Sequence, residues 1–394
     1  MKTILSLLSI AAVFVLNAQC DPVPIFANDS TNAVCFEEIA NTRRIYTNDI
    51  PDHAYGPFMG PNDIAGQDFE YNMCLYPTLN TVSTPLSEDT TSMACGGGIV
   101  FGLSHQGVLY SPFARLYFVN TSTLAENLNF EIEAEFTLTM DLNGGHVNAL
   151  SRYHYHNVPI DYLTNDLNVD GSSHSPLMGY AADGFPIYYK YLYTDPMDSF
   201  SGITGFQSDY QMLTGMRPGD GVSAPDGPYD GTYIQDYQQI PAQSELDECG
   251  GRFGVTPEYP NGTYYYVLTD NWPYIPRCLR GQFIDNSFKI GPNCPASTAA
   301  ADCALQSTMG IDQIKDEIGL SFFPNPTQNI LQVEIDDQFK DQITSISIYS
   351  SNGKQVYFST YQTDNIDLSE VLPGTYFVQI NFDDEQITKK LIIQ

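Results

Sequence analysis

Residues 151–159 read SRYHYHNVP, in which tyrosine and histidine alternate. Successive side chains of an extended chain point to opposite faces. A strand through this stretch would carry Tyr153 and Tyr155 on one face and His154 and His156 on the other. The two imidazoles would then stand side by side. Tyrosines packed in a core, with the histidines as ordinary polar groups on the other face, are the alternative to a functional role of the histidines.

The residues before this strand continue the β pattern. Residues 130–140, FEIEAEFTLTM, alternate apolar and polar side chains, which predicts a half-buried strand. The residues expected to point inward are Phe130, Ile132, Ala134, Phe136, Leu138 and Met140. The sequence DLNGGH (141–146) then indicates a glycine turn that delivers His146 to the start of the next strand. We expect a mainly β fold.

A second stretch of the chain is a weaker copy of this turn and strand. DLNGGH followed by YHYH has a counterpart in DECGGR (247–252) followed by YYYV. In that copy Arg252 takes the place of His146. Tyr265 and Val267 replace the two strand histidines. If the two stretches arose by internal duplication, the first copy has kept a set of metal ligands and the second only the fold. The alternative is that a short glycine motif recurs by chance.

The last part of the chain has the pattern of a separate small domain. From Leu320 to Gln394 short alternating runs recur, with Asn352-Gly353 as a hairpin turn. About seven short strands in such a segment are typical of an Ig-like β-sandwich. The residues before it are small and polar, which indicates a linker, and a bond between Cys294 and Cys303 would close a loop there.

The N-terminal residues indicate export. Residues 1–18, MKTILSLLSIAAVFVLNA, have the lysine, apolar run and final small residue of a secretory signal peptide. The apolar run is shorter than the roughly 20 residues of a membrane-spanning helix, and we expect no transmembrane segment. The expected division of the chain is a signal peptide (1–18), an N-terminal segment (19–94), a central β-rich domain (95–290), a linker (291–319) and a C-terminal β-sandwich (320–394).

Cysteine content and charge agree with an exported protein. The eight cysteines allow complete pairing, and disulfides persist in oxidising compartments. None forms a CxxC pair, which argues against a zinc-thiolate site. The formal net charge is -31, so nucleic acid and anionic lipid are poor partners. Such a charge also attracts cations, although solubility in a saline environment is the simpler interpretation.

Four stretches of the tail carry a family resemblance. FFPNPTQN (322–329), SNGK (351–354), LPGTYFVQI (372–380) and the terminal KKLII are similar to the type A C-terminal sorting domain of the type IX secretion system of Bacteroidetes. The resemblance implies that the type IX secretion machinery carries the protein to the outer cell surface or the medium, usually with removal of the tail. The strand pattern alone would suggest only an Ig-like module for adhesion.

Five stretches of the central region carry a second resemblance. They are GGHVNALSRYHYHNVP, HSPLMGYAADGFPIY, PDGPYDGTYIQDY, LDECGGR and GTYYYVLTDNWPYIPRCLRG, in that order. The region resembles the YHYH domain family, which implies no settled activity. LDEC and PRCLRG occur together in that family, so the resemblance implies a disulfide between Cys249 and Cys278.

Other motifs are weaker. DLNVDG (166–171) places Asp166, Asn168 and Asp170 at alternate positions of a calcium loop, but Leu177 stands where an EF-hand has glutamate. Two interpretations of this separate loop therefore stay open, a calcium site and a solvated turn. The sequence has no GxSxG, HExxH or phosphate-loop motif, so serine hydrolases, zincins and nucleotide enzymes have no support.

Histidine clustering gives the main functional hypothesis. Four of the six histidines lie between residues 146 and 174. We predict that His154 and His156 bind one transition metal together with His146, with His174 as a candidate fourth ligand. Neutral imidazoles suit copper or zinc better than calcium. The tyrosine-flanked, exported setting favours copper, as a binder or as an oxidoreductase; the alternative is a recognition or structural module at the cell surface, without metal.

Overall fold

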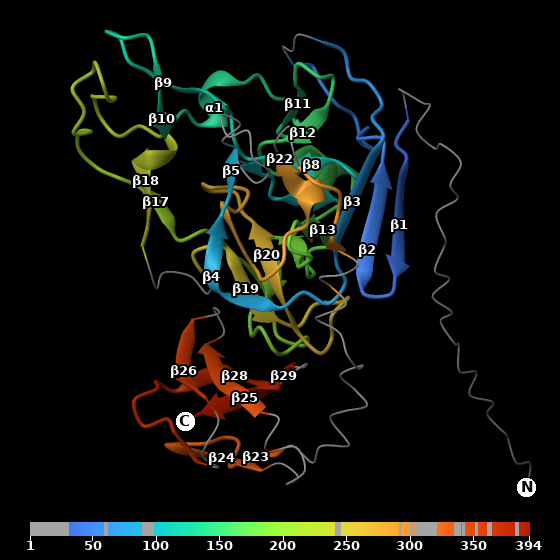
Figure 1. Ribbon diagram of the computed structural model, residues 1–394, viewed down its shortest axis with the longest axis vertical. Helices are drawn as coiled ribbons and strands as arrows, with labels where there is room; N and C mark the ends of the chain where they lie inside the picture. Colours follow the sequence, from blue (N-terminus) through green and yellow to red (C-terminus); the bar gives the residue numbers. More distant parts are fainter. Residues whose placement is uncertain are drawn as a thin grey trace, which may run out of the picture.

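The structure is a computed structural model that describes residues 31–58, 62–88, 98–240, 246–290, 294–299, 303, 321–334, 340, 343–350, 354–360, 365–382 and 386–394. These residues are mainly in β-strands, as the alternating sequence predicts. Figure 1 shows a large central domain above a smaller C-terminal domain in orange and red. The predicted signal peptide, the Asn352-Gly353 turn and most of the linker lie outside the described residues.

An eight-stranded sheet organises the central domain, with the strand order β11-β12-β8-β7-β13-β14-β20-β19. Its strands are β7 (Gly102–Ser104), β8 (Leu109–Tyr110), β11 (Gly145–Val147), β12 (Tyr153–Tyr155), β13 (Leu177–Ala181), β14 (Pro186–Tyr189), β19 (Gly251–Gly254) and β20 (Thr263–Leu268). The strand predicted from YHYH is β12, and Tyr153 and Tyr155 are fully buried in the core.

Smaller sheets and helical turns surround this sheet. The further strands of the domain are β1 (Val34–Ile39), β2 (Thr42–Thr47), β3 (Phe69–Cys74), β4 (Leu79–Pro85), β5 (Ser87–Glu88), β6 (Gly98–Ile99), β9 (Tyr117–Val119), β10 (Glu126–Glu131), β15 (Tyr191–Tyr193), β16 (Ile203–Gly205), β17 (Tyr210–Met212), β18 (Tyr237–Gln239), β21 (Cys278–Gly281) and β22 (Lys289–Ile290). The helical elements are α1 (Ala134–Thr137), η1 (Tyr162–Asp166), η2 (Ile234–Asp236) and η3 (Asn286–Phe288).

The eight-stranded sheet consists of two copies of one four-stranded unit. In the first copy β7 and β8 form a hairpin, β11 and β12 form another, and β12 runs parallel to β8. In the second copy β13 and β14, then β19 and β20, do the same, and β20 runs parallel to β14. The copies meet where β7 and β13 pair antiparallel at the centre of the sheet. The internal repeat expected from DLNGGH and DECGGR is therefore present in the fold.

The two glycine turns match in detail. The Asp141 carboxylate accepts the hydroxyl of Tyr153 at 2.8 Å and the backbone N–H groups of residues 143 and 145. The Asp247 carboxylate accepts the hydroxyl of Tyr264 at 2.9 Å and the N–H groups of residues 249 and 251. In both turns the tyrosine hydroxyl occupies the space that a Cβ on the second glycine would need. Glycine is therefore required at these positions because the tyrosine–aspartate bond passes over the backbone.

The stretch at residues 130–140 differs from its prediction. It is not one strand with Phe136 inward: β10 ends at Glu131, a helical turn follows, and Phe136 is 53% exposed. The acidic residue Glu133 is buried instead, because its carboxylate accepts hydrogen bonds from Trp272 and Arg277, both at 2.9 Å. A buried ion pair with a distant residue therefore reverses the orientation that the alternation predicts.

The C-terminal domain is a two-sheet sandwich, as predicted. One sheet has the order β23-β24-β27 and the other β26-β25-β28-β29. The strands are β23 (Ser321–Phe323), β24 (Ile330–Glu334), β25 (Ile343–Ser350), β26 (Gln355–Ser359), β27 (Asn365–Asp367), β28 (Gly374–Phe382) and β29 (Gln386–Ile393). Leu331 and Val333 of the first sheet share a core with Ile346 and Ile348 of the second. Phe377 of this domain packs on Phe253 of β19, with ring centroids 4.2 Å apart.

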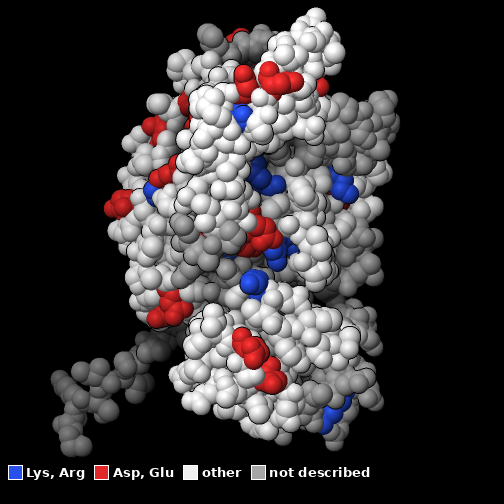
Figure 2. All heavy atoms as spheres, turned by 90° about the vertical axis from the view of Figure 1, so that its left-hand side faces the viewer, with Lys and Arg blue, Asp and Glu red and all other residues white. Residues whose placement is uncertain are grey.

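Charge on the surface is dispersed. On the face shown in Figure 2, acidic and basic side chains are scattered among uncharged ones, and neither sign forms a large continuous patch. Some of the buried charge is compensated by ion pairs, as in the pair of Arg217 with Asp236 and in the pair of Arg280 with Asp247. On the face shown, the acidic side chains are therefore not gathered at one site.

Two disulfides have both cysteines among the described residues. Cys249 pairs with Cys278, as the family resemblance implied. Cys303 pairs with Cys74, so the proposed Cys294–Cys303 loop is wrong. The reason is that the linker returns to the central domain, where buried Asp285 accepts the N–H groups of residues 298 and 299 and thereby places Cys303 beside β3. The linker is thus anchored to the domain before the chain continues to the sandwich.

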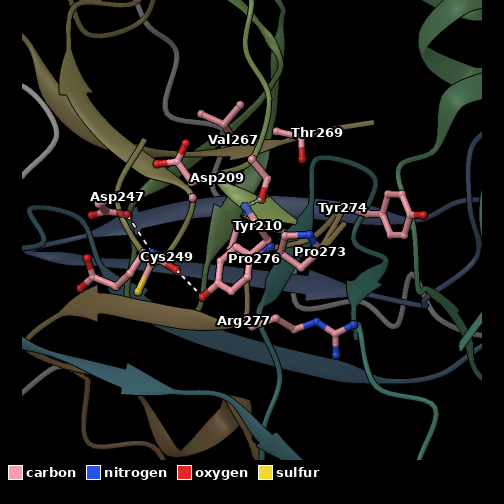
Figure 3. Close-up of a pocket in the computed structure, with 13 residues that line it drawn as sticks. Asp209, Tyr210, Asp247, Cys249, Val267, Thr269, Pro273, Tyr274, Pro276 and Arg277 are labelled. Atoms are coloured by element: carbon pink, nitrogen blue, oxygen red, sulfur yellow. Dashed lines mark hydrogen bonds between the residues drawn. The ribbon is translucent and has the colours of Figure 1, made fainter. Parts of the chain in front are cut away.

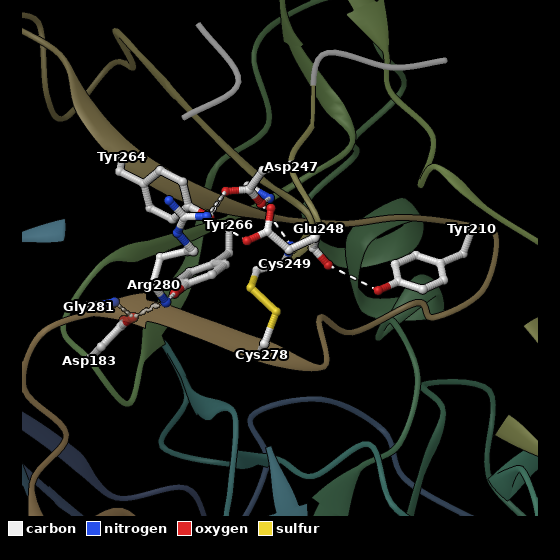
Figure 4. The surroundings of a disulfide bond; sticks show 11 residues. Asp183, Tyr210, Asp247, Glu248, Cys249, Tyr264, Tyr266, Cys278, Arg280 and Gly281 are labelled. Carbon is white, nitrogen blue, oxygen red and sulfur yellow. Dashed lines mark hydrogen bonds and ion pairs between the residues drawn. A yellow bond between two sulfur atoms is a disulfide. The ribbon is translucent and has the colours of Figure 1, made fainter. Parts of the chain in front are cut away.

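Removal of the Cys249–Cys278 bond should destabilise the central domain. The bond closes a 29-residue separation at the second glycine turn, beside the Asp247–Tyr264 hydrogen bond and Arg280 (Figure 4). In the chain-entropy description a loop of this length contributes roughly 3–4 kcal/mol. We expect the double variant Cys249→Ala/Cys278→Ala to lose about this free energy of unfolding, measured by urea titration of oxidised protein. A loss below about 1 kcal/mol would contradict the assignment.

Candidate metal centre

Three histidines converge on one side of the first hairpin. His146 lies on β11 directly opposite His154 on β12, and His156 follows at the end of β12. Their ring centroids are 4.7 to 4.9 Å apart in every pair. One nitrogen from each ring lies within 4.8 Å of the others. The hairpin register and the alternation of the strand together produce this grouping.

The distances fit a shared ion. The Nε2 atoms of His146 and His156 are 3.1 Å apart. Two nitrogens bound to one metal at about 2.0–2.1 Å lie roughly 2.9–3.4 Å apart for angles between square-planar and tetrahedral. The His146–His156 pair therefore already has ligand spacing.

One hydrogen bond selects the tautomer of His154. Its Nδ1–H donates to the carbonyl oxygen of Arg152 at 3.2 Å, which leaves Nε2 without a proton and free to bind a metal. The Nδ1 atom of His156 is buried and has no hydrogen-bond partner among the described residues. Among the described residues, the hydrogen bond of the His156 ring is therefore the one between its Nε2 atom and that of His146.

The surroundings keep the imidazoles neutral. Burial lowers the pKa of His154 to about 3, with a further contribution from nearby His146. Burial also lowers the pKa of His156 well below its usual value, assisted by the other two imidazoles and by the positive charge of Arg277. The pKa of His146 is lowered by burial as well. Neutral imidazole is the form that binds metals, so little proton competition is expected near neutral pH.

The structure places His174 away from this group. Its ring packs on Tyr188 and Tyr193, at centroid distances of 5.0 and 4.7 Å, and Nδ1 bonds with the carbonyl oxygen of Ser175. Tyr188 belongs to a separate cluster of the core beside the second copy. Of the four predicted ligands, the structure brings together His146, His154 and His156.

The DLNVDG loop shows no clustering of ligands. The Asp170 carboxylate accepts the N–H of Ser172 at 2.9 Å, which is the bond of a solvated turn. Among the described residues, the group of three or more metal-ligating side chains that the structure brings together is the histidine set. Calcium at this loop stays an untested prediction.

Sequence patterns did not reveal the residues that support the site. Glu133, at the start of α1, accepts a hydrogen bond from Arg277, whose positive charge acts on His156. Asp141 fixes the turn before His146. The signal that could have revealed Asp141 was its counterpart Asp247 in the repeat, whereas no sequence pattern pairs Glu133 with a residue so far away in the chain.

Comparison with protein families gives two matches. The family described as YHYH protein matches residues 70–281, more than half of the chain, and this range includes both copies of the repeat. The chain belongs to the YHYH protein family. The secretion system C-terminal sorting domain matches residues 321–394, the whole of the sandwich. No curated protein matches this YHYH protein.

The sorting domain indicates where this YHYH protein resides. A type IX sorting domain marks a protein for secretion or for the outer cell surface, and it implies recognition by the type IX secretion machinery. Within the described ranges, no helix has the length and apolar character needed to cross a bilayer.

Proposed function

We propose that this YHYH protein is an exported transition-metal-binding protein whose ligands are His146, His154 and His156. The observation that carries the proposal is the convergence of three neutral imidazoles from one hairpin, two of them already at ligand spacing. His174 is left out of the ligand set because it packs in another cluster. A fourth position would fall to water or to a bound molecule.

Copper is the favoured metal. Imidazole nitrogens suit both copper and zinc, and divalent copper binds a given nitrogen site more tightly than zinc. Zinc with three histidines and water would support hydrolysis or hydration, whereas copper would permit electron transfer. The buried tyrosines on the other face of β12 are compatible with a redox role for a bound copper ion. Redox activity is the second part of the proposal.

Metal content is the direct test. The protein would be refolded or secreted, dialysed against equal copper and zinc, and analysed by elemental mass spectrometry. We expect about one equivalent of metal per chain, with copper in excess over zinc, and nitrogen hyperfine splitting in the copper electron paramagnetic resonance spectrum. A protein that keeps neither metal would instead support the alternative, a surface recognition or structural module.

Processing provides a separate prediction. Because residues 1–18 have the pattern of a signal peptide and a sorting domain ends the sequence, we propose that the released protein begins near Gln19 and lacks the residues from about Leu320 onward. Intact-mass analysis of protein from the medium of the native host would show both ends. An intact C-terminal KKLIIQ in the released form would contradict the prediction.

A further inference from the structure

A groove opens beside the glycine turn of the first copy. It has a volume of about 840 Å³, within the roughly 300–1,000 Å³ of ligand sites. Gly144 and Asn157 are among its lining residues; Asn157 directly follows His156, and Gly144 lies two residues before His146. The groove therefore adjoins the histidine hairpin.

The corresponding space in the second copy is closed. Asp247 and Gly250, the counterparts of Asp141 and Gly144, line a pocket of only about 10 Å³, room for about one water molecule. Figure 3 shows Tyr210, Pro273 and Pro276 at this position. One scaffold therefore carries an open groove beside the histidines and a filled one beside Arg252. This difference between two copies of the same turn indicates that the open groove is a feature of the first copy rather than of the scaffold.

The lining of the groove is acidic and apolar. The carboxylates come from Glu135, Asp141 and Asp270, and no lysine or arginine is among the lining residues. Glu135 accepts from the neutral donors Asn157 and Tyr274, at 2.9 and 3.0 Å. Asp141 likewise accepts from a tyrosine hydroxyl and from backbone N–H groups. Within the described residues, only the charge of Asp270 is balanced by an ion pair, with Lys190.

Apolar side chains complete the surface. Leu142 and Ile160 line the groove and are 72% and 40% exposed, and Leu138 and Val158 lie among them. An extended ligand with positive and apolar side chains would complement both the carboxylates and the apolar side chains of the groove. Its charges would face Glu135 and Asp141, and its apolar groups would cover Leu142 and Ile160.

We propose that this groove binds an extended basic peptide segment that carries lysine or arginine next to apolar side chains. The proposal goes beyond the metal site, because the groove residues are not metal ligands and the peptide is expected to bind with or without an ion. The charge of the occupant follows from the unbalanced carboxylates. A volume of about 840 Å³ that opens to solvent accommodates a short peptide segment rather than a single ion.

Fluorescence anisotropy with a labelled hexapeptide of alternating lysine and leucine tests the proposal, with glutamate in place of lysine in the control peptide. Glu135→Gln removes the charge, while its oxygen can still accept from Asn157 and its amide N–H can donate to the Tyr274 hydroxyl, and we expect about 10-fold weaker binding. Thr139→Trp, at an exposed lining position, should fill the groove and abolish binding. Binding of the lysine peptide should also weaken with added salt.

The matched control is Asp63→Asn, which removes one exposed charge that is not among the lining residues of the groove. An effect of Asp63→Asn equal to that of Glu135→Gln would overturn the proposal, since it would show attraction by net charge alone. Unchanged binding by Thr139→Trp would overturn it as well. The variant His156→Ala should bind the peptide normally, so loss of metal with retained peptide binding separates the two hypotheses.

Discussion

Replacement of His156 by alanine should abolish metal retention by this YHYH protein. Loss of an outer hydrogen bond typically lowers metal affinity about 10- to 100-fold, so loss of a ligand should cost at least about 100-fold. His156 is also the most buried of the three histidines, and its Nε2 atom faces that of His146. We expect similar losses for His146→Ala and His154→Ala, measured by competition with a chromophoric chelator.

Two other histidines provide matched controls. His105→Ala removes an exposed imidazole, and His174→Gln removes the one that packs with Tyr188 and Tyr193. Both variants should bind the metal like the parent protein. Loss of the metal in His174→Gln, with unchanged circular dichroism and thermal unfolding, would show that the three-histidine ligand set is incomplete. It would support His174 as a fourth ligand.

Alanine at Gly102 or Gly179 should destabilise the central domain strongly. These glycines lie on β7 and β13, where the two copies meet. A Cβ at Gly102 would lie 2.5 Å from the carbonyl oxygen of Tyr180, and one at Gly179 would lie 2.1 Å from that of Leu103. Neither neighbour is a flexible side chain, so the central strands would have to move apart. We expect losses of about 3 kcal/mol or more in free energy of unfolding by urea titration.

The variant Gly215→Ala is a control that separates the effect of a steric clash from the effect of backbone strain. Gly215 and Gly179 both have positive φ, +102° and +146°, but a Cβ at Gly215 would meet nothing within 4 Å. Gly215→Ala should therefore cost only the conformational part, about 1–2 kcal/mol. Gly102 has the clash without the positive φ. Equal losses for Gly102→Ala and Gly215→Ala would show that the β7–β13 contact is looser than the structure indicates.

Local patterns predicted the elements that depend on local physics. The alternation of YHYH placed the two histidines on one face and the two tyrosines on the other because a strand has a period of two whatever surrounds it. The glycine turn also followed from the sequence, since Asp141 and Asp247 make the same bonds within a few residues of themselves. The match between the two motifs revealed the repeat for the same reason.

Predictions that needed distant partners were less successful. The stretch at residues 130–140 alternates like a strand, but the ion pair of Glu133 with Arg277 joins residues far apart in sequence and overrides the pattern. His174 is near the other histidines in sequence but packs beside the second copy of the unit. Cys303 likewise pairs with Cys74 rather than with its neighbour. Proximity along the chain is a weak guide where the sheet brings separate segments together.

The position of β11 at the edge of the eight-stranded sheet has a consequence for aggregation. An edge strand exposes unpaired backbone groups to which another chain can add. His146 is on this edge strand, whereas His154 is on its inner neighbour β12 and His156 directly follows it, so an ion bound by all three would hold the edge strand to the sheet. A bound metal would thus oppose the addition of another chain at this edge.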